Sequence, residues 1–217
     1  GALFILDEMV TGLRMGCPGA QKLYGVKADI STWGKGIANG YACSALTGRG
    51  DILRLGGIEP EGEEMLFLLS STHGAETVGL AACKATIDYA LEHDVSATIW
   101  STGECLKARL EAVIAKHGLG DALQLKGLPP YVLLMTNNHK GEPDLEFRTL
   151  FFQEMIAYGL LFMGGFVVTP SHGEAEINRT EAVFDHACGV YKSAIERQST
   201  EGLLDGPAIK NVFRKYL

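Results

Sequence analysis

Residues 2–8 of the chain read Ala-Leu-Phe-Ile-Leu-Asp-Glu, and the fold prediction depends on this segment. The apolar run Ala2–Leu6 has no polar alternation, which is typical of a strand buried on both faces in a parallel sheet that helices cover. Two acids, Asp7 and Glu8, follow at its carboxyl end. In open α/β sheets, ligands bind outside the carboxyl ends of the strands. An acid at this point is therefore well placed to meet a positively charged group on a ligand.

A lysine between two glycines follows 28 residues after the first acid (35 − 7 = 28), in the sequence Gly34-Lys35-Gly36. The glycines permit a tight bend and leave room for a bulky group bonded to the lysine amine. Each feature has a plain alternative, because an acid pair after a strand is often only a helix N-cap and a Gly-Lys-Gly sequence is often only an exposed loop. Both features together, in this order, favour a ligand site.

Six segments of the first 40 residues carry a resemblance to a known family: Asp7–Arg14, Gly19–Gln21, Tyr24–Val26, Asp29–Ile30, Gly34–Lys35 and Gly40. Together they resemble the class III (fold type I) pyridoxal-phosphate aminotransferases, and most of all the branch that includes glutamate-1-semialdehyde aminomutase. The resemblance implies an α/β fold, with part of the large mixed-sheet domain and the small C-terminal α+β domain. It implies that Lys35 holds pyridoxal phosphate as a Schiff base and moves the substrate proton. Asp7 is then expected to keep the ring nitrogen protonated, with Met9 packed against a ring face.

A hydroxyl run ending at Thr72 precedes a helical pattern that starts near Val78. The resemblance implies that Thr72 and Gly74 meet the cofactor phosphate of the other subunit in a homodimer with shared active sites. The following helix would add free amide groups and the positive end of its dipole. The family more commonly has Gly-Asn-Pro where this chain has residues 73–76, and a plain N-cap is the alternative role for Thr72.

The segment Ser171–Ala175 resembles the family's substrate-side loop, in which Glu174 is the matching acid. We expect this loop to precede a closing helix over residues 179–198. An exposed loop acid without a role at the site is the alternative for Glu174.

The rest of the pattern predicts alternating strands and helices, which we group into three regions. Strands are expected over residues 42–48, 65–69, 122–128, 131–135, 160–163 and 166–169, and helical segments over 51–55, 78–91, 95–117, 147–158 and 179–198. Pro129 and Pro130 should mark a turn or a sheet edge. We assign residues 1–117 to the cofactor-binding large domain, 118–198 to the small C-terminal domain and 199–217 to a tail without an assigned role.

Composition excludes several classes of protein. The chain has 217 residues and a formal charge of −7, which argues against nucleic acid and anionic membranes as partners. It contains neither an apolar run of about 20 residues nor a recognisable signal peptide. Its five cysteines show no metal-like spacing, which fits reduced thiols in the cytoplasm and predicts no metal site.

Because the chain begins inside a motif, we expect it to be the later half of a longer enzyme, whose glycine-rich phosphate loop and ring-stacking aromatic residue lie upstream.

The predicted function is an aminotransferase that moves an amino group between a small amino donor and an aldehyde or keto acceptor through Lys35. Fold and cofactor do not choose among pyridoxal-phosphate reactions, so an intramolecular aminomutase of the glutamate-1-semialdehyde type remains an alternative. Two others are an inactive fragment or interaction module and a lysine Schiff-base enzyme without a cofactor, such as an aldolase. Asp7 argues against the interaction module and the aldolase, since neither needs a carboxylate aimed at a ring nitrogen.

Overall fold

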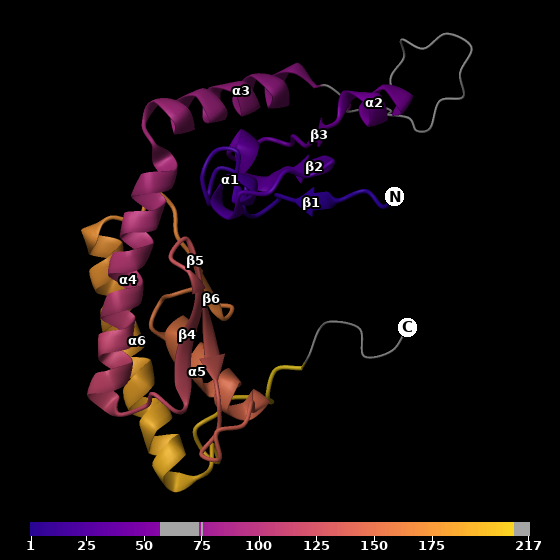
Figure 1. The fold of residues 1–217 in the computed structure, drawn as a ribbon. Coiled ribbons are helices and arrows are strands. Elements are labelled where there is room, and N and C mark those ends of the chain that lie inside the picture. Colours follow the sequence, from indigo (N-terminus) through magenta and orange to yellow (C-terminus); the bar gives the residue numbers. More distant parts are fainter. Residues whose placement is uncertain (57–73, 75, 211–217) are drawn as a thin grey trace. The chain divides into compact units, whose positions relative to one another are not determined.

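The structure is a computed structural model that describes residues 1–56, 74 and 76–210. The chain divides into two compact units, Gly1–Thr98 and Ile99–Leu217, and each contains one three-stranded sheet (Figure 1). The helix expected over residues 95–117 is present as α4 (Val95–His117). The division between the two units falls inside this helix, whose buried side chains Leu106 and Leu110 lie in the second unit. The domain boundary expected after residue 117 stays a prediction.

The first unit is built on a mixed sheet of β1 (Ile5–Asp7), β2 (Ile30–Trp33) and β3 (Ala45–Gly48), in that order. β1 and β2 run parallel, and β2 and β3 run antiparallel. The described helices of this unit are α1 (Ala20–Tyr24), η1 (Lys35–Ala38), α2 (Gly50–Leu53), η2 (Arg54–Gly56) and α3 (Thr77–Glu92). The expected helical turn at 51–55 and the expected helix at 78–91 are thus confirmed, whereas the strand expected at 65–69 lies outside the described residues.

The first strand is shorter and more exposed than its sequence predicts. β1 begins at Ile5, and the side chain of Ile5 is 59% exposed. The expectation of burial on both faces is wrong for the described chain, because β1 is an edge strand there, paired only with β2. Its pairing continues to Phe4, whose N–H donates to the carboxylate of Asp29 and whose C=O accepts from the Asp29 N–H.

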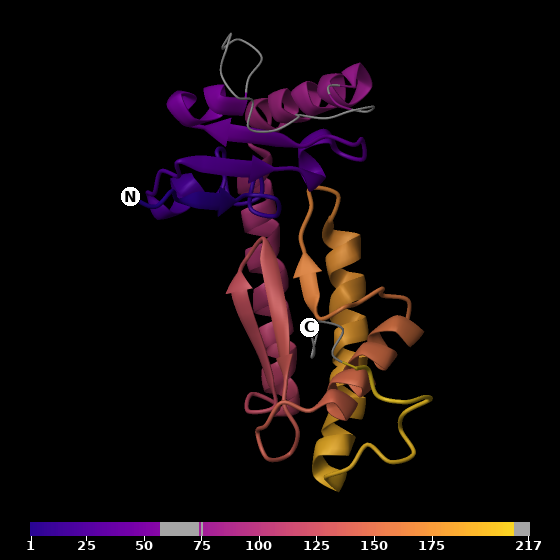
Figure 2. The same ribbon diagram turned by 90° about the vertical axis from the view of Figure 1, so that its right-hand side faces the viewer.

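The second unit contains an antiparallel sheet of β4 (Leu123–Leu128), β5 (Tyr131–Thr136) and β6 (Gly165–Val167), in that order (Figure 2). Pro129 and Pro130 form the two-residue turn of the β4–β5 hairpin, as predicted, because neither proline could donate a ladder hydrogen bond. Of the two strands expected around Gly164, only β6 forms. In the segment 160–163, Phe162 is buried while Leu161 and Met163 are exposed, but this alternating segment pairs with no described strand.

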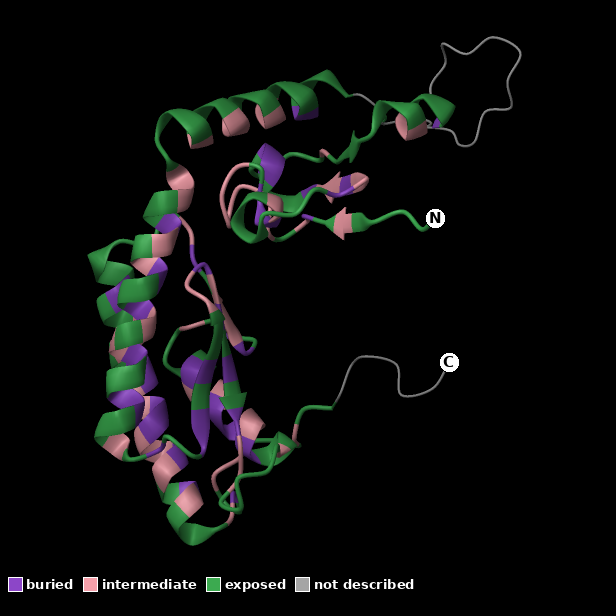
Figure 3. Cartoon of the chain, in the orientation of Figure 1, coloured by how far each residue is buried: buried purple, intermediate pink, exposed green. Residues whose placement is uncertain are grey.

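Three helices accompany this sheet: α4, α5 (Leu145–Ala157) and α6 (Glu174–Arg197). The side chain of Asp144 caps α5 by accepting from the N–H groups of Glu146 and Phe147. Buried residues gather between the helices and the sheet of this unit (Figure 3). The largest fully buried apolar side chains include Leu110, Leu123, Val132, Leu150, Phe151, Met155, Phe184 and Tyr191.

Two C-terminal features differ from the predicted pattern. α6 begins five residues earlier than expected, because the Glu176 carboxylate accepts from the Gly173 N–H and caps the first turn. The described part of the tail, residues 199–210, lies along α5: Gln153 bonds the backbone of Leu203 and Asp205, and the Thr149 hydroxyl accepts from the Ile209 N–H. None of the helices in the described ranges is long and apolar enough to span a bilayer.

Candidate active site

The pairing of β1 with β2 brings Asp7 and the segment of Lys35 to one edge of the sheet. Asp7 ends β1 and lies opposite Thr32 in the parallel register. β2 ends at Trp33, and Lys35 follows two residues later as the first residue of η1. Since parallel strands end at the same edge, the acid and the lysine that the sequence singles out emerge side by side from neighbouring strands.

The carboxylate of Asp7 is oriented by contacts to both strands. Its Oδ1 accepts from the backbone N–H of Met9 at 2.8 Å and from the Thr32 hydroxyl at 3.4 Å. The side chain is exposed, so its acidic end is open to a ligand. Sequence reasoning missed Thr32, and the only signal for it was a pair of hydroxyl residues within an otherwise apolar strand.

Met9 lies between the acid and the lysine segment. A Cβ added at Gly34 would stand 2.5 Å from Cε and 2.8 Å from Sδ of Met9. Only glycine therefore allows this thioether to pack directly against the backbone that precedes Lys35. The structure brings Asp7, Met9 and the backbone segment that leads to Lys35 to one edge of the sheet, and the roles expected of the three residues stay predictions.

Lys35 has an unusual backbone conformation. Its φ is 50°, in the left-handed region that non-glycine residues rarely adopt. Such strain persists only where the surroundings enforce it, and it concentrates at functional sites. The side chain is exposed, and a Cβ added at the next residue, Gly36, would meet nothing within 4 Å. The exposed Lys35 side chain and the open space at Gly36 leave room on this side of the segment for a bonded group.

Glu8 has a different role from its neighbour Asp7. It is fully buried, and its carboxylate accepts from the Thr11 hydroxyl and from the N–H groups of Ala20 at 2.9 Å and Gln21 at 3.0 Å. These contacts satisfy the first amides of α1 and close the loop that follows β1. The acid pair thus divides into one exposed carboxylate for the site and one buried carboxylate that holds the loop, which the sequence did not distinguish.

The structure does not test the other predicted site residues at this edge. Thr72 lies outside the described residues, and Gly74 is described only as an exposed turn residue. We expected Glu174 to lie in a loop. It is instead the first residue of α6, because this helix starts earlier than predicted. Its Oε1 lies 2.6 Å from Nη2 of Arg109 on α4. That ion pair is part of a cluster that also joins Arg109 to Asn178 and Glu181.

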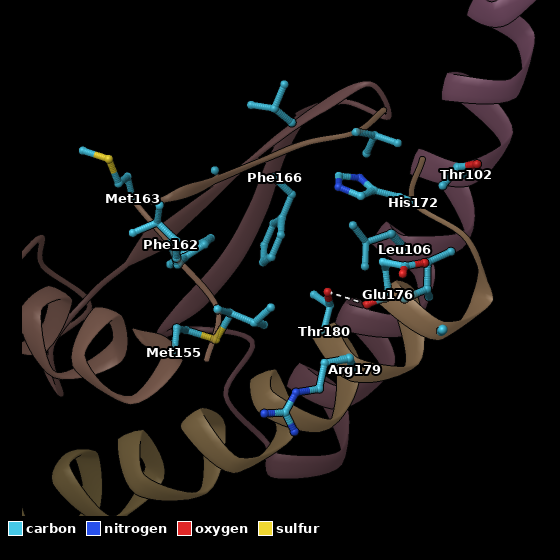
Figure 4. Close-up of a pocket in the computed structure, with 17 residues that line it drawn as sticks. Thr102, Leu106, Met155, Phe162, Met163, Phe166, His172, Glu176, Arg179 and Thr180 are labelled. Atoms are coloured by element: carbon cyan, nitrogen blue, oxygen red, sulfur yellow. Dashed lines mark hydrogen bonds between the residues drawn. The ribbon is translucent and has the colours of Figure 1, made fainter. Parts of the chain in front are cut away.

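The second unit contains a cavity of about 600 Å³ between its sheet, α4 and α6 (Figure 4). Its walls are mainly apolar, with Phe162 and Phe166 on one side and Leu106 on another. The polar groups at its rim are bonded within the protein: Arg179 donates to the C=O of Tyr158, and the Thr180 hydroxyl donates to the C=O of Glu176. Glu174, the predicted site residue that the structure describes in this unit, does not line this cavity. Within the described residues, no group of three or more His, Cys, Asp or Glu side chains could hold a metal ion.

Comparison with known proteins connects the Asp7–Lys35 edge to one family. The class-III aminotransferase family matches residues 1–142. A 2'-deamino-2'-hydroxyneamine transaminase of Streptomyces kanamyceticus is 36% identical over 119 residues, which cover 55% of this chain and 28% of that protein. A glutamate-1-semialdehyde 2,1-aminomutase of Legionella pneumophila is 32% identical over 205 residues, which cover 89% of this chain and 46% of that protein.

The fold agrees with this assignment. A solved structure described as a transaminase with PLP bound superposes with a TM-score of 0.78 at 22% identity, over 90% of this chain and 46% of that one. The predicted fold type I architecture is thereby confirmed, and the expectation of pyridoxal phosphate as the cofactor is supported. The chain spans less than half the length of these relatives. The matched family, together with the shared fold and the edge that joins Asp7 to Lys35, identifies this chain as a member of the class-III aminotransferases.

Proposed function

We propose that the protein is a pyridoxal-phosphate-dependent aminotransferase in which Lys35 binds the cofactor. The observation that carries the proposal is the emergence of Asp7 and Lys35 from the ends of two paired parallel strands. An aldehyde requires an amine with free space around it, and a pyridine nitrogen requires a carboxylate if it is to stay protonated. The exposed Lys35 amine and the oriented Asp7 carboxylate supply both groups, so the residues present fit this part of the cofactor.

Each residue has a distinct task in this mechanism. Pyridoxal phosphate, when bound, supplies an electron sink for the carbon that carries the substrate amino group. Lys35 would hold the cofactor covalently through Nζ, and the same Nζ is the group that would move the proton of that carbon. Asp7 keeps a proton on the ring nitrogen through its carboxylate, which Thr32 and the Met9 N–H orient. Met9 limits where the ring can lie.

The test is reduction with borohydride, which makes the bond between lysine and cofactor permanent. Because the chain spans less than half of its relatives, the assay uses the complete reading frame that encodes it. Peptide mapping should find the pyridoxyl label at Lys35. The exposed Lys22 and Lys27 of the same unit are matched internal controls. A label on either of them with none on Lys35 would refute the assignment, and Lys35→Ala should abolish both the label and amino transfer.

An intramolecular aminomutase is the second candidate, because glutamate-1-semialdehyde 2,1-aminomutases match up to 89% of the chain. The two functions differ in where the amino group goes. Incubation with an amino donor and a separate keto acid should give an amino acid derived from that acceptor if the protein is a transaminase. Conversion of glutamate-1-semialdehyde without any external acceptor would instead identify the mutase.

We further propose a homodimer in which Thr72 and Gly74 meet the partner's cofactor phosphate, and a location in the cytoplasm, which the five free thiols support. A buried phosphate without enough donors is costly, so a donor from a second subunit would complete the site. Mixing Lys35→Ala with Thr72→Ala dimers should restore about a quarter of normal activity, since half of the dimers are mixed and each has one intact site. Mixtures that stay inactive after confirmed subunit exchange would exclude a role for Thr72 across the interface.

A further inference from the structure

Helix α3 packs closely against the segment that follows the lysine. Within the first unit, α3 contacts η1, whose first residue is Lys35. A Cβ added at Gly79 of α3 would stand 2.4 Å from the C=O of Ala42 and 3.9 Å from Cβ of Cys43. The absence of a side chain at Gly79 therefore lets this helix lie directly on residues 42 and 43.

The same face of α3 presents a second thiol to Cys43. Cys83 is one helical turn beyond Gly79, and residues four apart lie on one face of a helix. The Cys83 thiol interacts with that of Cys43: burial, and then hydrogen bonding to Cys43, raise its pKa above the ordinary value. Both side chains are free and only partly buried, so small oxidants can reach them.

The other cysteines have different surroundings. Cys188 is fully buried in the core of the second unit, where burial raises its pKa to about 12 and shields the thiol from oxidants. Cys105 is exposed on α4, where it bonds to Arg109. Cys17 lies on the loop before α1. Cys83 on α3 and Cys43 are thus the two cysteines whose thiols interact.

From this juxtaposition we infer that Cys43 and Cys83 form a reversible disulfide when the protein meets a peroxide. One thiolate attacks the peroxide O–O bond, so that a sulfur–oxygen bond forms and one water leaves. The second thiol attacks this sulfur, which forms the S–S bond and releases a second water. The two thiols lose two protons and two electrons, and hydrogen peroxide is reduced to two waters. A dithiol reductant reverses the reaction.

The bridge would fix α3 against the segment behind Lys35. It closes a loop, from residue 43 to residue 83, that contains Thr72 and Gly74. Oxidation would therefore restrain the segment that follows Lys35, the residue proposed to bind the cofactor. Only this last link rests on the proposed function, because the bridge itself requires neither cofactor nor partner.

Non-reducing peptide mapping after brief treatment with hydrogen peroxide tests the inference without any activity assay. The folded protein should yield a peptide pair linked through Cys43 and Cys83, and dithiothreitol should remove it. Cys105→Ser is the matched control and should leave the link intact, while Cys43→Ser should abolish it. Mapping of the unmutated protein alone suffices if a variant fails to fold.

Three results would overturn the inference: both cysteines remain open to alkylation, Cys83 links to a different cysteine, or the link forms equally fast in urea. Hydrogen exchange gives a second readout. Oxidation should slow exchange in α3 and in residues 35–43, and unchanged exchange there would show that the bridge does not fix the helix. A failed borohydride label at Lys35 would leave all of these results unaffected.

Discussion

The two units of this chain differ in what holds them together. The second unit buries large side chains, among them Phe151, Phe184 and Tyr191. The buried apolar side chains of the described first unit are smaller, with Ala20, Ala28, Ile37 and Ala38, while larger ones are exposed: Leu3, Phe4, Ile5 and Leu46. Each large side chain taken fully out of water contributes about 1.5–3 kcal/mol. The unit that contains the candidate active site therefore gains less from packing than its neighbour.

Polar contacts supply part of the stabilisation of the first unit. Glu8 closes the loop after β1, and Arg49 pairs with Asp29, whose other oxygen extends the pairing of β1. The backbone N–H donated by Phe4, and then Arg49, hold the pKa of Asp29 below its ordinary value. Directional hydrogen bonds and tight turns therefore set the geometry at Asp7 and Lys35, whereas the fit of side chains in the core sets the geometry of the second unit.

Phe151→Ala should have the largest effect on stability. Phe151 is fully buried and its ring meets those of Phe184 and Tyr191 at 5.1 Å and 5.7 Å. Its loss should lower the unfolding free energy of the second unit by about 3–5 kcal/mol. The chain has one tryptophan in each unit, so Trp100 fluorescence in a Trp33→Phe background reports this unit alone.

The matched control is Leu161→Ala, at a side chain that is 91% exposed, with an expected change within about 0.5 kcal/mol. Equal effects of the two substitutions would mean that the second unit has no packed core. In the Trp100→Phe background, Trp33 should show that neither substitution affects the first unit.

Asp7→Asn should act on chemistry and not on folding. Asparagine keeps the shape of the side chain but removes the charge that holds the ring-nitrogen proton. Amino transfer should fall by about 10²–10³-fold, the usual cost of removing one electrostatic partner at a reacting centre. The borohydride label at Lys35 should persist. Near-normal turnover in Asp7→Asn, with the exposed-site control Asp88→Asn also normal, would contradict the proposed role.

Glu8→Gln tests whether polar contacts stabilise the first unit. The amide keeps the volume but turns one acceptor oxygen into a donor facing the N–H groups of Ala20 or Gln21. The unfolding free energy of this unit should fall by about 1–3 kcal/mol, measured through Trp33 in the Trp100→Phe background. Glu92→Gln, at an exposed site in the same unit, should change little. If Glu8→Gln left the unfolding free energy unchanged, packing and not the buried carboxylate would hold the loop.

Asp185→Asn should give the smallest effect, and one that depends on pH. Hydrogen bonds from Lys116 and then His117 lower the pKa of Asp185 from its ordinary value of 3.8. A depressed folded-state pKa means that its contribution is present above about pH 3.8 and is lost as the pH falls through the folded value. The difference in melting temperature between the parent and Asp185→Asn should therefore exist at pH 7 and vanish in acid. A difference that persists below both pKa values would show that the charge is not its source. Asp121→Asn is the exposed control in the same unit.

The spacing of apolar residues and the positions of glycine and proline predicted the local helices and turns well. The helix Val95–His117 agrees with its predicted bounds, and Pro129-Pro130 forms the expected hairpin turn. Both depend on interactions within a few residues, so the sequence alone contains the necessary information. The start of α6 was missed because its cap is a glutamate side chain that folds back onto Gly173, with no hydroxyl or Asx residue at the N-cap to announce it.

Local pattern and family resemblance were enough to single out Asp7, Met9 and Lys35 as candidate site residues. The contacts that hold these residues become visible only in the three-dimensional fold. The register of β1 against β2 places Thr32 opposite Asp7, the missing side chain of Gly34 admits Met9, and burial separates Glu8 from Asp7. The first two relations each join residues 25 positions apart along the chain (32 − 7 and 34 − 9), and the third gives two neighbouring residues opposite environments. Strand pairing and close packing set them, and no local preference of the chain encodes either.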